Sequence, residues 1–536
     1  SGTPTTCENT NAWLYADASA TAKVFGKSYS KSYALYTRTN SPVRCAYHYE
    51  DGVSVQQCTR GNTSQGYTGS ASGYNGKYYT STTSKNYNPT GSSYQDEMGQ
   101  TKPRFTYTLD DDGNATITGC NNITSSLVIP GEIDGHTVIV IDESAFSGAT
   151  NLVSVSIPDS VTEIQDYAFQ NCTKLTSIDI PDSVTLIDYQ AFYGCTKLAS
   201  VKLSNNLKTL GTRAFGNCTA LTEITIPASL TSAGSPFKDC SNLKTIHFEE
   251  GITKIVGGLF SGCTGITEIS IPDTVAIIDE SAFSGATNLV SVSIPDSVTE
   301  IQDYAFQNCT KLTSIDIPDS VTLVDWQAFY GCTKLASVKL SNNLKTLGTR
   351  AFGNCTALTE ITIPASITAL PSNTFYGCTS LAKVTLPDTL TSIGSYVFQE
   401  CDTLTTVTIP TSVVEIGGYA FSGCDKLAEV NLSDGLKTIG NNAFYNCVSL
   451  KSITIPRTVT SLGTGAFSGD KALAEVTLGT GLTSIPTECF YQIPALTKIR
   501  VPNRVIKIGD RAFANCTKLT EVTLPAATTS ISSSAF

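Results

Sequence analysis

The fold is encoded most clearly in Leu175–Lys197, LTSIDIPDSVTLIDYQAFYGCTK, and variants of this segment recur along most of the chain. Leu175, Ile178 and Ile180 stand at or near alternate positions, as in a short strand with one buried face. Pro181 ends this strand, because proline has no amide hydrogen to give to a β-ladder. A second short apolar stretch and a turn with large and small buried groups follow, so each repeat is predicted to be a coil filled by its own side chains.

The spacing of phenylalanine gives the period. A phenylalanine recurs every 23 residues from Phe146 to Phe536, with a single 22-residue step just before Phe237, and this pattern makes eighteen repeats. A period of about 20 to 30 residues is typical of a solenoid, in which each repeat buries its apolar face against its neighbours. The sequence therefore predicts a curved rod of about 18 coils, with short parallel strands stacked ~4.8 Å apart.

Two kinds of side chain repeat with this period and are predicted to form ladders through the core. Thirteen of the 18 cysteines stand three residues after a repeat phenylalanine. In three successive coils the ladder residues are Phe169, Phe192, Phe215, Cys172, Cys195 and Cys218. Neighbouring cysteines would have parallel Cβ vectors, whereas a disulfide needs converging ones, so we expect buried free thiols. A metal array is not expected, because the chain has only 3 histidines and none neighbours another.

The repeat pattern L-x-x-I-x-I-P, V-x-x-I and A-F-x-x-C over residues 104–536 resembles the BspA-like leucine-rich repeats. Proteins of this family occur on the surfaces of bacteria and of some parasitic protists. The lead-in, residues 104–130, resembles the family's N-terminal capping hairpin, with a turn at Asp110 to Asn114. The resemblance implies a β-rich leucine-rich-repeat solenoid that attaches to host matrix proteins or to other cells.

Part of the array is duplicated. Residues 141–229 and 278–366 match at every position except Ile187 against Val324 and Tyr189 against Trp326. An enzyme needs one unique arrangement of catalytic residues, whereas a copied segment supplies every residue twice. The duplication therefore favours reach or multivalency over catalysis, and no enzyme activity is expected.

The first 103 residues have a different composition. They hold 12 of the 23 tyrosines, and nine Lys and Arg against six Asp and Glu give a balance of +3, which leaves −14 for residues 104–536 out of the total of −11. Residues 11–58 are rich enough in β-branched and aromatic residues for a small β-domain, and a linker is predicted after it. A disulfide between Cys45 and Cys58 is expected in an oxidising compartment. The tyrosine-rich region could also be a sugar-binding or protein-binding surface.

Several classes of function are excluded by the sequence. The long array is acidic and would repel the phosphates of nucleic acid. No apolar run approaches the length of about twenty residues that a membrane span requires, and no cofactor or catalytic motif is present. Because the chain starts at Ser1 without a methionine, we expect a secreted or cell-surface protein whose signal peptide has been removed. It stops at Phe536 in the middle of a coil, so further repeats or an anchoring segment are expected beyond it.

The candidate contact residues are aromatics outside the strands. They are Tyr189, Tyr193, Trp326, Tyr330 and Tyr376. Such rings could contact a ligand or could cap the apolar core at a turn. The outward positions of the first strand are mostly small and polar, so weak contacts summed over repeats are expected on that face. Three functions remain open: an adhesin that binds a protein ligand, a self-associating structural component, and a glycan-binding protein.

Overall fold

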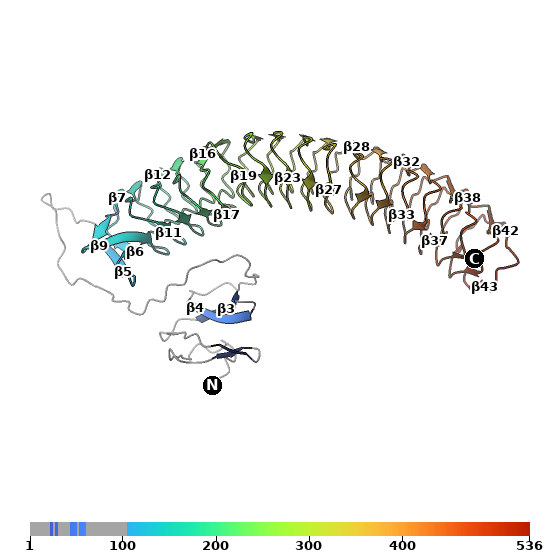
Figure 1. Ribbon diagram of the computed structural model, residues 1–536, viewed down its shortest axis with the longest axis horizontal. Coiled ribbons are helices and arrows are strands. Elements are labelled where there is room, and N and C mark those ends of the chain that lie inside the picture. Colours follow the sequence, from blue (N-terminus) through green and yellow to red (C-terminus); the bar gives the residue numbers. More distant parts are fainter. Residues whose placement is uncertain (1–21, 25–26, 30–42, 51–52, 61–103) are drawn as a thin grey trace. The chain divides into compact units, whose positions relative to one another are not determined.

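The structure, a computed structural model, describes residues 104–536 and the strand residues 22–24, 27–29, 43–50 and 53–60 (Figure 1). The chain divides into two compact units, residues 1–82 and 83–536, and each is described by itself. In the first unit, two antiparallel pairs are present, and their strands are β1 (Ala22–Val24), β2 (Lys27–Tyr29), β3 (Val43–Glu50) and β4 (Val53–Arg60). The register of β3 and β4 places Cys45 opposite Cys58. Their side chains, and the predicted linker over residues 61–95, lie outside the part of the chain that the structure describes.

The described part of the second compact unit, which holds the whole array of repeats, begins with a hairpin. Strand β5 (Arg104–Leu109) pairs antiparallel with β6 (Ala115–Asn121), and β6 pairs parallel with β9 (His136–Ile141) of the first coil. Two further short strands, β7 (Ser126–Val128) and β8 (Glu132–Ile133), belong to this start of the array. The turn between β5 and β6 is fixed by Asp110, whose Oδ1 accepts hydrogen bonds from the amides of Asp112 at 3.1 Å and Asn114 at 2.7 Å.

Each following coil contributes one strand to each of two faces and then a turn. The first strands are β10 (Ser154–Ser156), β12 (Ser177–Asp179), β14 (Ser200–Lys202), β16 (Glu223–Ile226), β18 (Thr245–Phe248), β20 (Glu268–Ser270), β22 (Ser291–Ser293), β24 (Ser314–Asp316), β26 (Ser337–Lys339), β28 (Glu360–Thr362), β30 (Lys383–Thr385), β32 (Thr406–Thr408), β34 (Glu429–Asn431), β36 (Ser452–Thr454), β38 (Glu475–Thr477), β40 (Lys498–Arg500) and β42 (Glu521–Thr523). Figure 1 shows strands of this set, such as β12, β28 and β38, along the outer edge of the arc that the repeat unit forms.

The second strands have two residues each and lie nearer the inner edge of the arc (Figure 1). They are β11 (Glu163–Ile164), β13 (Leu186–Ile187), β15 (Thr209–Leu210), β17 (Ser232–Ala233), β19 (Lys254–Ile255), β21 (Ile277–Ile278), β23 (Glu300–Ile301), β25 (Leu323–Val324), β27 (Thr346–Leu347), β29 (Ala369–Leu370), β31 (Ser392–Ile393), β33 (Glu415–Ile416), β35 (Thr438–Ile439), β37 (Ser461–Leu462), β39 (Ser484–Ile485), β41 (Lys507–Ile508) and β43 (Ser530–Ile531). Pairing within both sets is parallel, which confirms the predicted β-solenoid of about eighteen coils.

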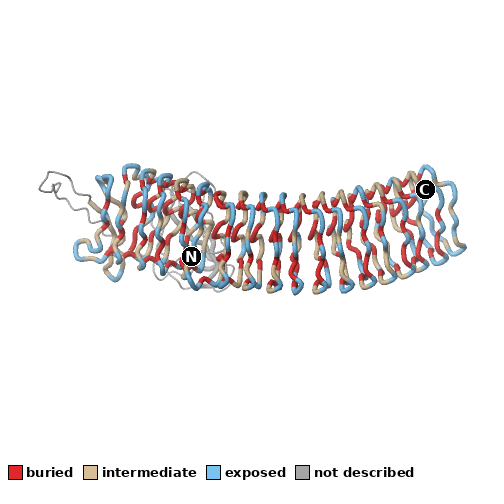
Figure 2. The backbone as a smooth tube through the Cα atoms, turned by 90° about the horizontal axis from the view of Figure 1, so that it is seen from above, coloured by how far each residue is buried: buried red, intermediate tan, exposed pale blue. Residues whose placement is uncertain are grey.

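The buried residues form one continuous core cluster along the array, and Figure 2 shows them as red segments that recur from coil to coil. The repeat phenylalanines form its centre, with neighbouring rings nearly parallel and centroids 5.0 Å apart from Phe169 to Phe192 and from Phe192 to Phe215. Each of these rings is 0% exposed. No coil could bury such a ring alone, so the stability of each coil depends on its neighbours.

The turn that carries each phenylalanine has an unusual backbone. In all seventeen coils from Phe146 to Phe513, the residues two before and two after the phenylalanine have positive φ. This conformation points alternate amides along the array, so that the amide of Phe146 donates to the carbonyl of Ala168 in the next coil at 2.7 Å. Glycine or asparagine fits this left-handed region at many of the positions after the ring, whereas the positions before it also hold Tyr and Arg.

The second strands do not form one uninterrupted sheet. The strands β11 to β17 belong to an eight-stranded sheet that also contains β5, β6, β8 and β9, and the later second strands form sheets of five, five and three, so the breaks fall after β17, β27 and β37. The first break falls at the coil with the 22-residue step, and Pro371 and Pro486 follow β29 and β39 at the other two. In an unbroken coil the amide at this position donates to the preceding coil, as Gly394 does to Leu370 at 2.8 Å. Proline cannot donate, so these two coils lose one rung of the ladder.

The thiol ladder also stabilises neighbouring coils. Twelve of the thirteen ladder cysteines donate from Sγ to the carbonyl of the phenylalanine in the preceding coil, at 3.1–3.5 Å, as Cys195 does to Phe169 at 3.3 Å. The cysteines of this ladder are buried and free. Burial raises the pKa of the Cys218 thiol to about 12, so it stays protonated and able to donate.

Asp470 replaces the cysteine in one coil. It stands three residues after Phe467, is 0% exposed, and accepts a hydrogen bond at Oδ1 from the amide of Cys447 at 2.8 Å. Its other oxygen, Oδ2, is buried without a partner. Burial raises the pKa of Asp470 well above its usual value.

Candidate functional site

The five aromatic residues proposed as contacts all lie on the turn side of the coils, in two rows. Tyr189 and Trp326 stand three residues before a repeat phenylalanine, and Tyr193, Tyr330 and Tyr376 stand one residue after it. Four of them are half-buried, and Trp326 is 40% exposed.

The rings of the second row pack between coils. The ring of Tyr330 lies 2.9 Å from the point where a Cβ on Gly353 would stand, and its hydroxyl accepts a hydrogen bond from Asn354 Nδ2 at 2.8 Å. Tyr193 lies in the same way over Gly216. Glycine in the next coil therefore leaves room for the ring, and these tyrosines cover the core at the turn.

The rings of the first row belong to aromatic pairs whose second members the sequence did not reveal. Tyr167 meets Tyr189 edge-on, with ring centroids 5.2 Å apart, and Tyr304 meets Trp326 at 4.9 Å. A third pair, formed by two tyrosines that stand two residues before their phenylalanines, is stacked in parallel at 5.0 Å; its members are Tyr396 and Tyr419. In each pair the rings come from adjacent coils, so tyrosines 22 or 23 residues apart were the available sequence signal.

Carboxylates surround the two duplicated pairs. The amide of Trp326 donates both to Asp325 Oδ1 at 2.8 Å and to Asp303 Oδ1 at 3.0 Å. The amide of Tyr189 makes the same two bonds in the first copy, to Asp188 at 2.8 Å and Asp166 at 3.0 Å. The duplication thus gives the array two aromatic–carboxylate sites of nearly identical construction.

The two carboxylates of each site repel one another. Burial, and then the nearby charge of Asp188, raises the pKa of Asp166 to about 7. Burial and the charge of Asp325 likewise raise the pKa of Asp303. Within the part of the chain that the structure describes, none of these four carboxylates forms an ion pair.

The third pair lies beside a groove of a different character. A depression of about 480 Å³ runs past Tyr396 and Tyr419 over a floor that includes Gly440 and Gly463, and none of the residues that line it is charged. A Cβ on Gly463 would stand 2.3 Å from the backbone of the preceding coil, so glycine permits the close stacking of coils there.

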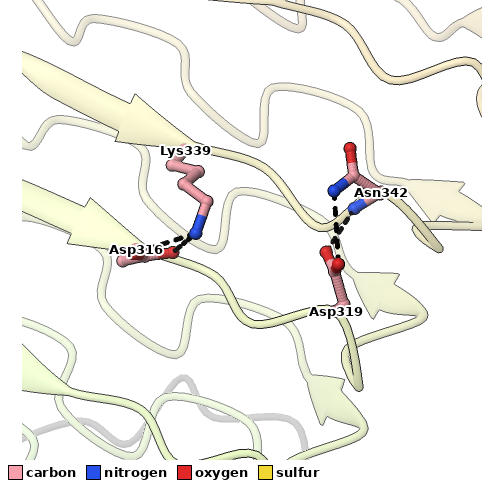
Figure 3. A network of polar contacts seen from close by, with 4 residues as sticks. All are labelled: Asp316, Asp319, Lys339 and Asn342. Atoms are coloured by element: carbon pink, nitrogen blue, oxygen red, sulfur yellow. Dashed lines mark hydrogen bonds and ion pairs between the residues drawn. The ribbon is translucent and has the colours of Figure 1, made fainter.

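The outer strands carry small polar and charged residues, as expected. Figure 3 shows Lys339 Nζ of β26 on the carboxylate of Asp316 of β24, at 2.9 and 3.1 Å, and Asn342 held by Asp319 in the same two coils. These contacts join adjacent coils at the surface, where ion pairs contribute little to stability. The exposed positions of these described strands hold no Phe, Tyr or Trp, and Phe248 of β18 is half-buried.

The described residues contain neither a metal-binding cluster nor a membrane-spanning helix. Among residues 104–536 and the four described strands before them, no group of three His, Cys, Asp or Glu side chains could hold a metal ion. In the same residues no helix is long and apolar enough to cross a bilayer.

The coil geometry defines a leucine-rich-repeat solenoid. A family model of the BspA type leucine rich repeat region matches residues 113–236, 234–358, 299–428, 350–474 and 437–536. The chain therefore belongs to the family of proteins with BspA-type leucine-rich repeats, as the resemblance of the repeat motif implied.

Solved structures with similarity to this chain include two proteins with leucine-rich repeats. A leucine-rich repeat protein from Bacteroides ovatus is 32% identical, with 70% of this chain and 98% of that chain covered and a TM-score of 0.59. A leucine rich cell surface protein from Faecalibacterium prausnitzii is 25% identical over 81% of this chain and 94% of that chain, with a TM-score of 0.32. No curated protein matches the chain.

Proposed function

We propose that this protein is a non-catalytic, extracellular or cell-surface protein that binds protein ligands, such as host matrix proteins or the surfaces of other cells, through its repeat array. Membership of the BspA-type family supports this proposal, since proteins of this family are typically non-catalytic surface proteins that mediate protein–protein interactions. The copying of residues 141–229 as 278–366 supports it further, because duplication multiplies contact sites and does not build one unique site.

The main support for the proposal is the separation of core and surface positions within each coil. Most bulky aliphatic residues and the repeat phenylalanines from Phe146 to Phe513 are buried, so the array has one continuous core and leaves its outer side chains free to vary. Some aromatic rings outside the core are exposed, such as Trp326, Tyr396 and Tyr445 at 40, 36 and 38%. Trp and Tyr are the types of residue that dominate protein interfaces. Weak contacts repeated along one chain can sum to a high affinity.

The test is a binding panel. The full chain would be passed over immobilised host matrix proteins, over glycans and over itself, with bovine serum albumin as the negative surface. Saturable binding to a matrix protein is expected. Binding to glycans alone would favour the carbohydrate-binding function, and concentration-dependent self-association alone would favour the structural one.

A pair of matched variants tests whether the interaction lies on the array. The first variant changes Trp326 and Tyr396 to Ala. It should bind the matrix protein more weakly, because both rings are exposed and belong to aromatic pairs. The control variant changes Val414 and Ile506, which are 47 and 53% exposed, to Ala. It removes apolar surface outside the aromatic pairs and should leave binding unchanged. Equal losses in the two variants would contradict a role for the aromatic pairs.

A further inference from the structure

The two aromatic–carboxylate sites differ in the contacts of one glutamine amide nitrogen. In the first copy, Gln170 Nε2 donates to Gln190 Oε1 at 2.9 Å, and Gln190 Nε2 donates to the hydroxyl of Tyr189 at 2.9 Å. In the second copy, Gln307 Nε2 donates to Gln327 Oε1 at 2.8 Å, so the amide of Gln327 has the same orientation.

The amide nitrogen of Gln327 is left without an acceptor. The residue that corresponds to Tyr189 is Trp326, and an indole has no oxygen. Gln327 is only 8% exposed, and its Nε2 makes no hydrogen bond with any residue in the part of the chain that the structure describes. Gln327 shares the orientation of Gln190, whose Nε2 reaches the hydroxyl of the residue that corresponds to Trp326, so its Nε2 is a donor that a ligand carbonyl can satisfy.

The charge at the site is uncompensated. Asp303 and Asp325 both accept from the amide of Trp326 and form no ion pair in the described chain, and the charge of Glu280 also acts on Asp303. A planar guanidinium can bind two carboxylate oxygens and can also lie over an indole face. The site thus combines acceptors for a cation, a ring for its face and a donor for a neighbouring carbonyl.

We propose that the Tyr304–Trp326 site binds an arginine side chain of a basic protein segment, with the carboxylates of Asp303 and Asp325 on the guanidinium and Gln327 Nε2 on a backbone carbonyl of the same segment. The Tyr167–Tyr189 site is its weaker second copy, because Gln190 Nε2 is already bound to Tyr189. This inference rests on the proposed function, since it names the chemistry of the protein partner.

The spacing of the two sites sets the spacing of the basic residues. Six coils separate them, and stacked strands are ~4.8 Å apart, so the sites are on the order of 30 Å apart. An extended peptide covers ~3.3–3.6 Å per residue, so about nine residues should separate the two arginines. A ligand that reaches both sites should bind at least about tenfold more tightly than one that reaches only one.

Trp326 itself reports binding. The chain has 2 tryptophans, so Trp13→Phe leaves Trp326 as the single indole of the full chain. The probes are three synthetic Gly/Ser peptides: one with a single arginine, one with two arginines nine residues apart, and one with citrulline at both positions. Saturable change of Trp326 emission with the arginine peptides, weaker in high salt and absent with the citrulline peptide, is expected. The same response to citrulline, or no response to arginine, would overturn the proposal.

Two variants separate the copies. Asp303→Asn with Asp325→Asn should abolish the response to the single-arginine peptide, whereas Asp316→Asn, an exposed carboxylate on β24, should not. Asp166→Asn with Asp188→Asn should leave the single-arginine response intact and remove the tenfold gain of the two-arginine peptide. If it leaves that gain intact, the bivalent arrangement is wrong.

Other results distinguish this inference from the function on which it rests. Trp326→Tyr restores the residue of the first copy, so it should fold, and its weaker arginine binding would be measured by calorimetry because the reporter indole is gone. A chain that binds matrix protein on the panel but gives no arginine response would retain the proposed function and refute the arginine site. A change of Trp326 emission with a neutral oligosaccharide, and none with the arginine peptides, would indicate a sugar-binding site in place of the arginine site.

Discussion

Replacing Asp470 by asparagine should stabilise the array at neutral pH. Asp470 Oδ2 is buried without a partner, and such an atom costs about 1–3 kcal/mol. Elsewhere the ladder thiol donates to the phenylalanine carbonyl of the preceding coil, as Cys447 does to Phe421 at 3.2 Å. In Asp470→Asn, the new Nδ2 can donate to the corresponding carbonyl of Phe444, and Oδ1 can still accept from the Cys447 amide. We therefore expect a gain of about 1–3 kcal/mol at pH 7.

The gain should depend on pH with a definite sign. The unfolded chain holds Asp470 at an ordinary pKa of about 3.9, while burial raises its folded pKa well above that value. The folded protein therefore binds a proton that the unfolded chain does not. The contribution of the aspartic acid to stability is fully present below about pH 3.9 and is lost as the pH rises through the folded pKa. The advantage of Asp470→Asn should be present at pH 7 and should shrink toward pH 4.

Hydrogen exchange is the suitable assay, because solenoids open locally and a single unfolding free energy is not well defined for a long array. The amide of Cys447, which donates to Asp470 Oδ1, should exchange more slowly in Asp470→Asn at pH 7, after correction for intrinsic rates. Asp434→Asn, which removes an exposed partner of Arg457, should change nothing in that coil. Faster exchange in Asp470→Asn, or an equal effect at both pH values, would refute the assignment of an unpartnered buried carboxyl.

Three further changes test the coil packing. Phe329→Ala removes a fully buried ring stacked between two neighbours, should destabilise its coils by about 3–5 kcal/mol, and can be followed by local hydrogen exchange. Gly331→Ala places a Cβ 2.3 Å from Asn308 Oδ1 at a positive φ and should cost about 1 kcal/mol or more of local stability by hydrogen exchange, whereas unchanged exchange in that coil would contradict the clash. Pro371→Ala supplies the missing donor to Leu347 and should slow exchange in β27 and β29; no new protected amide would show that the break has another cause.

The sequence was sufficient to predict the fold of each coil but not the aromatic pairs on the surface of the array. The 23-residue spacing of phenylalanine and the alternation after Leu175 predicted the strands, because burial of one face is a local property of the pattern. The aromatic pairs depend on a left-handed residue, such as Tyr304, that brings its ring against a residue of the next coil, and that geometry does not follow from a pattern of burial. Asp470 could have been found, since it occupies the register of a ladder cysteine.

The domain boundary and the disulfide remain predictions. The amino-acid composition changes near residue 103, and the described strands of the first unit place Cys45 opposite Cys58 without describing their side chains. The prolines that divide the inner sheets were visible in the sequence, but their effect depends on which amides face the neighbouring coil, and only the stacked coils establish that.

The proposed function requires that the repeat array itself binds the protein ligand. A comparison of two affinities tests this requirement: that of the full chain and that of residues 83–536, the compact repeat unit, for the matrix protein selected on the panel. We predict that the repeat unit retains the affinity of the full chain, and that changing the exposed aromatic pairs reduces it. Loss of binding with the removal of residues 1–82 alone would contradict this prediction and would place the interaction on the first unit.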